Sequence, residues 1–382
     1  MRRTVCDMAM TKLFLKLFRL FLTLAIVFSI CPSSYSKSNI EKIHFDKTKV
    51  PKGCASCHVG HGRVKTAMLP ERKDLFCFIC HGYPDTLEKA LTDGIVTNNF
   101  DQQNIKKEFE KPYRHPVERT GTHKYDEILP EIDPSMPRHV ECEDCHHHHY
   151  VSKENKMLGL KGTYLNRSKG AITNEYELCF NCHSYSANLP LDQTNKAELF
   201  NTANPSFHPV IGPGKNTFVP SLLQPLTSSS QIKCSNCHGN DDPLGPKGPH
   251  GSQYNYLLFK SFSKTDGPES VQQYELCYSC HSRVSILNNE SFQYHNLHIS
   301  NEGASCRTCH NPHGSTRNLH LIDFENYSSI RPSKSGRLSY ISFGPNAGQC
   351  YLNCHDKDHD PEVYPKGSTK PATQPSSSKK KK

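Results

Sequence analysis

The sequence predicts a fold of mostly loops and short α-helices with very little β-structure, in which amino-acid side chains supply only a small part of the core. Only 35% of the 382 residues are hydrophobic and none is Trp, whereas ordinary globular domains are roughly 45–50% apolar. Sixteen of the 18 cysteines occur in eight short signatures, each of two cysteines followed directly by a histidine. A chain this polar needs apolar surface from another source to stabilise a fold of this length.

The eight signatures indicate what that source is. Seven have the spacing Cys-x-x-Cys-His, and the eighth, Cys350/Cys354/His355, has one more residue between its cysteines. Cys-x-x-Cys-His is the attachment sequence of c-type haem, in which the thiols bind the vinyl groups and the histidine binds iron. We therefore predict eight covalently attached haem c groups. The predicted thioether residues are Cys54, Cys57, Cys77, Cys80, Cys142, Cys145, Cys179, Cys182, Cys234, Cys237, Cys277, Cys280, Cys306, Cys309, Cys350 and Cys354. The predicted proximal iron ligands are His58, His81, His146, His183, His238, His281, His310 and His355.

Two other uses of paired cysteines explain less of the pattern. A zinc site or a redox dithiol would account for one isolated Cys-x-x-Cys pair. Neither requires a histidine directly after the second cysteine, yet all eight pairs have one. A disulfide framework, common in exported chains rich in cysteine, explains neither the pairing nor the histidines. Haem attachment is the favoured interpretation, and the Cys350 signature is its least typical member.

The first residues predict where the protein is located. Residues 1–16 are basic, residues 20–30 are apolar, and residues 34–36 offer a Ser-Tyr-Ser cleavage site, so residues 1–36 have the pattern of a secretory signal peptide. The apolar run is too short to span a bilayer comfortably, and no second such run follows. We expect an exported protein, in the periplasm or at the outer surface or outside the cell, with no integral membrane segment in the mature chain.

The formal net charge of +9 is concentrated at the two ends of the chain. Residues 1–36 hold five Lys or Arg and one Asp, and residues 361–382 hold six Lys and one Glu. The body between them has 35 basic and 35 acidic residues, and haem propionates would make it acidic. Such a body offers no basic stripe for nucleic acid, so we predict no nucleic-acid partner. Residues 361–382, a tail rich in Pro, Ser and Lys, are predicted to be disordered.

An internal repeat divides the remaining chain into four tandem dihaem units. Residues 174–189 and 272–287 align position by position, with the second signature of a pair at their centre, and they are expected to form short helices. Pro-His-Gly-Ser also occurs twice, at 249–252 and 312–315. The predicted units are residues 37–110, 111–203, 204–290 and 291–360. Neighbouring haems would pack across these boundaries, so the units are not expected to fold independently.

Histidines outside the signatures repeat with the same period. One precedes each pair of signatures and one follows its first signature, so each unit carries two histidines beyond its proximal ligands. Two such residues per unit complete bis-histidine coordination of eight haems. The predicted distal ligands are His44, His61, His115, His149, His208, His250, His298 and His313. His295 remains an alternative to His298, and His147 and His148 remain alternatives to His149, while His123, His139, His320 and His359 are spare or alternative.

The pattern resembles the doubled-CXXCH family of multihaem c-type cytochromes, from His44 to about His359. The stretches Cys234-Ser-Asn-Cys-His-Gly and Cys306-Arg-Thr-Cys-His-Asn-Pro-His-Gly-Ser are the most similar to it. The resemblance implies an exported electron carrier whose partners are other redox proteins, such as cytochromes or an outer-membrane porin–cytochrome conduit. It also implies service in anaerobic or extracellular respiration. The chain departs from the family pattern at the Cys350 signature.

Two axial histidines per iron leave no position for a substrate, so the sequence favours an electron carrier over an enzyme. One alternative is a multihaem reductase with a single open haem, for which the Cys350 signature is the strongest candidate. Another alternative is a subunit of an extracellular haem filament.

Overall fold

The computed structural model describes residues 42–59, 68–100, 103–117, 140–185, 189, 193–324, 329–354 and 357–369. Backbone contacts group residues 42–382 into one unit and residues 1–41 into another. Among the described residues, no helix is both long and apolar enough to cross a membrane. The predicted signal peptide lies outside the described residues, as do His61, His123, His139, His355 and the end of the predicted tail.

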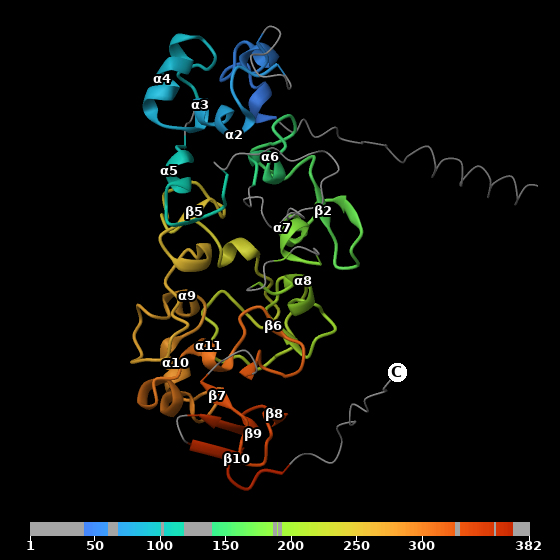
Figure 1. The fold of residues 1–382 in the computed structure, drawn as a ribbon, viewed down its shortest axis with the longest axis vertical. Coiled ribbons are helices and arrows are strands. Elements are labelled where there is room, and N and C mark those ends of the chain that lie inside the picture. Colours follow the sequence, from blue (N-terminus) through green and yellow to red (C-terminus); the bar gives the residue numbers. More distant parts are fainter. Residues whose placement is uncertain are drawn as a thin grey trace, which may run out of the picture. The chain divides into compact units, whose positions relative to one another are not determined.

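Short helices carry seven of the signatures (Figure 1). In six of them, the N–H of the signature histidine donates to the carbonyl oxygen of the first cysteine at 2.8–3.0 Å, and in the seventh all three residues lie within α7. One helical turn places residues three apart on the same side, so both thiols of a signature face the same way. The carrying segments are η2 (Gly53–Ser56), α3 (Phe78–His81), α6 (Cys142–Cys145), α7 (Glu175–His183), η3 (Cys234–Asn236), α9 (Glu275–Tyr278) and α11 (Cys306–Cys309).

The other helices are also short, and loops connect them. They are η1 (Ile43–Phe45), α2 (Lys73–Phe76), α4 (Pro84–Thr92), α5 (Lys106–Phe109), α8 (Lys196–Leu199), η4 (Asn255–Leu257), α10 (Arg283–Leu287) and the π-helical turn η5 (Leu297–Asn301). Buried side chains form only two small clusters among the described residues, one around Phe78 and Phe109 and one around Phe324, Ile330 and Leu352. The loop-rich architecture agrees with the fold class expected from composition.

Pairs of two-residue strands connect segments from different predicted units. β1 (Tyr113–Arg114) pairs antiparallel with β5 (Gly251–Ser252), and β4 (Ser206–Phe207) pairs in the same way with β6 (Gly314–Ser315). The glycines are required by close backbone approach: a Cβ at Gly251 would lie 1.7 Å from the Glu108 carbonyl oxygen, and one at Gly314 would lie 2.0 Å from the Leu199 carbonyl oxygen. The repeated Pro-His-Gly-Ser sequence therefore marks a backbone junction between units.

The predicted fourth unit ends in a sheet that the sequence does not predict, and the last strand of this sheet continues to Tyr364, inside the segment 361–382 that is predicted to be disordered. β9 (Ala347–Cys354) pairs antiparallel with β7 (Ile330–Arg331), β8 (Ser339–Gly344) and β10 (Lys357–Tyr364), and Figure 1 shows this sheet towards the C-terminal end. A smaller hairpin joins β2 (Lys161–Thr163) to β3 (Lys169–Ala171). Cys350 and Cys354 lie on β9, so the eighth signature occupies a strand instead of a helical turn.

Asp266 connects a long loop to the helix of the seventh signature. Its carboxylate accepts hydrogen bonds from the Ser305 N–H at 2.9 Å and from the hydroxyl groups of Thr308 and Ser329. Burial raises the pKa of Asp266, but these hydrogen bonds outweigh burial, and the pKa lies below the ordinary value of 3.8. The hydrogen bonds therefore favour the ionised carboxylate.

We expect Asp266→Asn to lower the free energy of unfolding by about 1–3 kcal/mol near neutral pH, because it leaves buried donors without a carboxylate acceptor. Stabilisation from a depressed pKa is present above the unfolded pKa and is lost as the pH falls through the folded pKa. The difference from wild type should therefore shrink below pH ~3. Chemical denaturation at both pH values measures it, with the exposed Glu302→Gln as control. An undiminished difference in acid would contradict this assignment.

Candidate haem-binding sites

Each predicted proximal histidine that the structure describes faces a second histidine. The two ring centroids lie 6.1–6.5 Å apart in every case. An imidazole nitrogen binds a metal at about 2 Å, and the ring centre lies roughly 1 Å behind it, so two imidazoles on opposite sides of one ion have centroids about 6 Å apart. The pairs are His58–His149 (6.2 Å), His81–His44 (6.2 Å), His146–His250 (6.2 Å), His183–His115 (6.4 Å), His238–His313 (6.1 Å), His281–His208 (6.5 Å) and His310–His295 (6.5 Å).

The pairs do not keep to single units, although each unit carries enough histidines to serve its own two haems. The second signature of each of the first three units faces the upstream histidine of its own unit, as in His81–His44. The first signature instead faces the histidine that follows the first signature of the next unit, as in His58–His149 and His146–His250. The junction strands explain this exchange, because they bring the upstream segment of one unit beside the later segment of the next.

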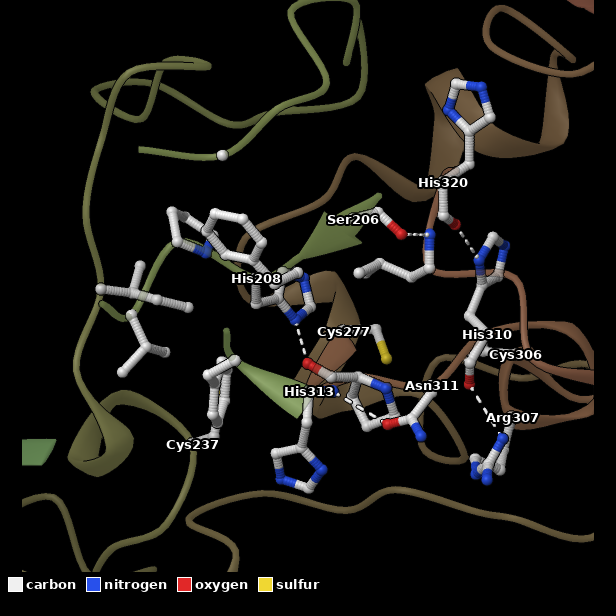
Figure 2. A pocket seen from close by; sticks show the side chains of 18 of the residues that line it. Ser206, His208, Cys237, Cys277, Cys306, Arg307, His310, Asn311, His313 and His320 are labelled. Atoms are coloured by element: carbon white, nitrogen blue, oxygen red, sulfur yellow. Dashed lines mark hydrogen bonds between the residues drawn. The ribbon is translucent and has the colours of Figure 1, made fainter. Parts of the chain in front are cut away.

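Hydrogen bonds at these junctions orient the upstream histidines. Nδ1 of His44 lies 2.8 Å from the His148 carbonyl oxygen, and Nδ1 of His115 lies 2.8 Å from the Pro249 carbonyl oxygen. His208 makes the equivalent bond to Pro312 (Figure 2). An Nδ1 that donates to a carbonyl carries the proton, which leaves the Nε2 lone pair available to a metal. The carbonyl that orients each upstream histidine thus belongs to the residue directly before a histidine that faces a first signature.

Several proximal histidines have the same arrangement. Nδ1 lies 2.8 Å from a carbonyl oxygen in His238 (to Tyr256) and in His310 (to His320), and 3.2 Å away in His146 (to Lys156). In His281, Nδ1 lies 3.0 Å from the Ser221 hydroxyl. These bonds fix the ring orientation and favour the tautomer that binds a metal through Nε2.

Burial favours the neutral form of four of the paired imidazoles. Burial, with a smaller contribution from a neighbouring histidine, lowers the pKa of His81, His183 and His250 to about 4. His310 has its pKa lowered to about 4 in the same way, mainly by burial. Neutral imidazole is the form that binds metal ions. These four histidines therefore present neutral nitrogen donors.

A connected cavity of about 1920 Å³ runs past these groups. It is lined by cysteines of the third to the eighth signatures and by histidines from four of the seven pairs. Figure 2 shows His208, His310 and His313 around it, with Cys237, Cys277 and Cys306 nearby. The donor set, the tautomers and the space all fit covalently bound haem.

Thiols of successive signatures lie beside one another. The pKa of Cys179 is raised well above its ordinary value, first by a hydrogen bond with Cys234 of the next signature. Burial, with smaller contributions from Cys350 and Cys354, raises the pKa of Cys309 to about 12. Each signature interacts with the next one along the chain. Thiol hydrogen bonds join Cys77–Cys142, Cys179–Cys234 and Cys277–Cys306, and electrostatic interactions join Cys57–Cys80, Cys145–Cys182, Cys237–Cys280 and Cys309–Cys350.

The histidines left open by the sequence occupy distinct places. His295 lies against His310, whereas His298 lies 6.4 Å from His359. Nδ1 of His148 lies 3.2 Å from the Glu143 carboxylate, and the His148 ring centroid lies 4.0 Å from that of His149. The remaining placements are His147 against Tyr150 at 4.5 Å and His320 near Asn216 at 3.3 Å.

Comparison with known proteins covers part of the chain. A family model described as the doubled CXXCH motif matches residues 48–85 and 225–285, which hold the two signatures of the first and third predicted units. No curated protein and no solved structure matches the chain. The matched motifs, together with the local geometry of their cysteines and histidines, support a doubled-CXXCH multihaem c-type cytochrome, with covalently bound haem c and a role in electron transfer.

Proposed function

We propose that this chain is an exported octahaem c-type cytochrome that carries electrons along bis-histidine haems ordered as their signatures are in the sequence. The observation that carries the proposal is the unbroken series of neighbouring thiols from the first signature to the eighth. Haems attached to adjacent thiols have adjacent edges. Four dihaem units joined in this way form one path through the protein.

The residues of the chain perform three tasks in this function. Each histidine pair would hold the iron of one haem between its two imidazoles, which would exclude substrate and water from the iron and keep its ligands the same in both oxidation states. The carbonyl acceptors of the Nδ1 protons hold the rings in place. Haem supplies one-electron exchange when bound, and its potential is set by the axial ligands, burial and hydrogen bonds that the chain provides.

The partners and compartment follow from the same proposal. If every iron has two histidine ligands, no substrate can bind to the iron, and electrons must enter and leave at the protein surface. The proposed partners are therefore other redox proteins, among them an outer-membrane porin–cytochrome conduit. The signal-peptide pattern of residues 1–36 supports export to the periplasm or onward to the cell surface. Anaerobic or extracellular respiration is the setting that this arrangement fits.

Intact mass spectrometry and low-temperature EPR of the air-oxidised holoprotein test the proposal. We expect eight haems by mass and low-spin ferric signals that account for all of them. Film voltammetry should give reversible current over a broad potential window, since the haems differ in burial and hydrogen bonding. A high-spin signal near one haem in eight would instead indicate an open iron and favour the reductase alternative. A chain without covalent haem would overturn the proposal.

A further inference from the structure

The eighth signature presents its thiols differently from the others. Cys350, Leu352 and Cys354 alternate along β9, so their side chains share one face of the sheet. At about 3.3 Å per residue, the two cysteines are separated by roughly 13 Å along the strand, against about 5–6 Å for side chains one helical turn apart. The seventh signature's Cys309 nevertheless interacts with both of them. The strand therefore places two widely separated thiols, Cys350 and Cys354, beside the seventh signature.

The neighbouring strand adds an imidazole between those thiols. His359 on β10 is the register partner of Leu352, which lies midway between Cys350 and Cys354. Residues directly opposite each other in an antiparallel pair project from the same face. One face of the β9–β10 hairpin thus carries two thiols and a histidine. Nδ1 of His359 is buried and has no hydrogen-bond partner within the described residues.

A second histidine faces His359 at the separation found in the other pairs. The ring centroids of His298 and His359 are 6.4 Å apart, within the 6.1–6.5 Å range of the seven pairs described above. Nδ1 of His298 lies 2.8 Å from the Tyr294 carbonyl oxygen, which leaves its Nε2 available. His298 is also the upstream histidine of the fourth unit. In the first three units, the equivalent histidine faces the histidine of the second signature.

Aromatic side chains pack around His298. The Phe292 ring stacks on His298 at 5.8 Å with an interplanar angle of 12°, and Tyr364 packs edge-on against Phe292 at 4.7 Å. The Tyr364 hydroxyl donates to the Tyr340 hydroxyl at 3.1 Å. All three aromatic residues line the same cavity as Cys350, Cys354 and His359. A wall of this kind excludes water from a flat apolar group.

From the paired rings, the shared strand face and the repeat position, we propose that His298 and His359 are the axial ligands of the eighth haem, so that His359 takes the role that the signature assigns to His355. This inference rests on the proposed function, because it requires an eighth haem. It makes the β9–β10 hairpin a haem site in which thiols and imidazole come from two strands instead of one helical turn.

The test compares two matched substitutions in the full holoprotein, His359→Met and His355→Met. A methionine that replaces an axial histidine binds ferric iron through sulfur and adds a methionine-to-iron charge-transfer band, which is absent from bis-histidine haem. Absorption and EPR spectra are recorded for both variants, and intact mass gives the number of haems in each and in wild type. We expect the new band, at the intensity of one haem, in His359→Met and not in His355→Met.

The other outcomes each overturn the inference in a recognisable way. The band in His355→Met alone would return the ligand role to the signature histidine and leave the proposed function unchanged. The band in neither variant would exclude His359. A wild-type mass with seven haems would remove the eighth site and correct the proposed haem count, whereas a wild type without haem would overturn the proposed function itself.

Discussion

A chain that cannot attach haem is expected to show no cooperative unfolding transition. The described residues bury two small side-chain clusters, and the principal cavity of about 1920 Å³ is where porphyrins would lie. Emptying that space exposes its apolar lining to water, while the entropy cost of ordering the loops is unchanged. The short helices add little of their own, because isolated helices of this length are not stable in water.

The measurement is far-UV circular dichroism against temperature, on a chain expressed without its signal region and therefore kept from haem attachment. The control is the holoprotein in the same buffer. We expect a weak, nearly linear signal change from the apo-chain and a sigmoidal transition from the holoprotein. A sigmoidal apo transition would mean that side chains alone specify this fold, and the low apolar content would then need another explanation.

The sequence predicts most of the local chemistry of this protein. A signature such as Cys306/Cys309/His310 needs only one helical turn to place its groups, so its geometry depends on neighbours in the chain and can be recognised directly. The repeat likewise indicates which further histidines accompany the signatures. His44, His115 and His208 each precede a pair, and the structure places each of them against another histidine.

The sequence does not predict which unit a histidine serves. His149 follows its own unit's first signature by only a few residues, and periodicity is equally compatible with service to that unit or to the preceding one. Which unit the histidine serves depends on pairing between backbone segments that are distant in the sequence, such as Lys42 with Ser152. Strands of two residues are too short to show an alternation of polar and apolar residues in the sequence. The junction glycines Gly251 and Gly314 are the detectable signal, because their repetition marks a close backbone approach.

The C-terminal sheet was missed for a different reason. In the segment from Cys350 to Cys354 only the central Leu352 is buried, so burial here does not show the period-two alternation by which a strand is recognised. The presence of a haem signature in the same residues favours a helical turn, as in the other seven. The four-residue spacing that makes this signature atypical also puts both cysteines on one face of a strand. The extra residue between Cys350 and Cys354 is therefore the feature of the sequence that indicates a strand instead of a helical turn.

Removing the side chain of His313 should open a haem in the preceding unit. Its ring lies 6.1 Å from that of His238 and nearly parallel to it, at 3°. The His313 backbone pairs with His208 through the His208 N–H at 3.2 Å, and this bond survives in His313→Ala. We expect low-temperature EPR of the variant to show a high-spin ferric signal of one haem in eight. His320→Ala, in which the side chain lies outside every histidine pair described here, is the matched control and should remain low-spin.

Two backgrounds identify which haem has opened. With Cys234 and Cys237 replaced by serine, the haem that faces His313 is absent, and His313→Ala should add no high-spin signal. With Cys306 and Cys309 replaced instead, the haem nearest to His313 in sequence is absent, and the signal should persist. Intact mass must show seven haems in both backgrounds. The opposite pattern would mean that His313 serves its own unit. The expected pattern would establish that adjacent units share ligands, and such sharing couples their folding, because neither unit could complete its haems alone.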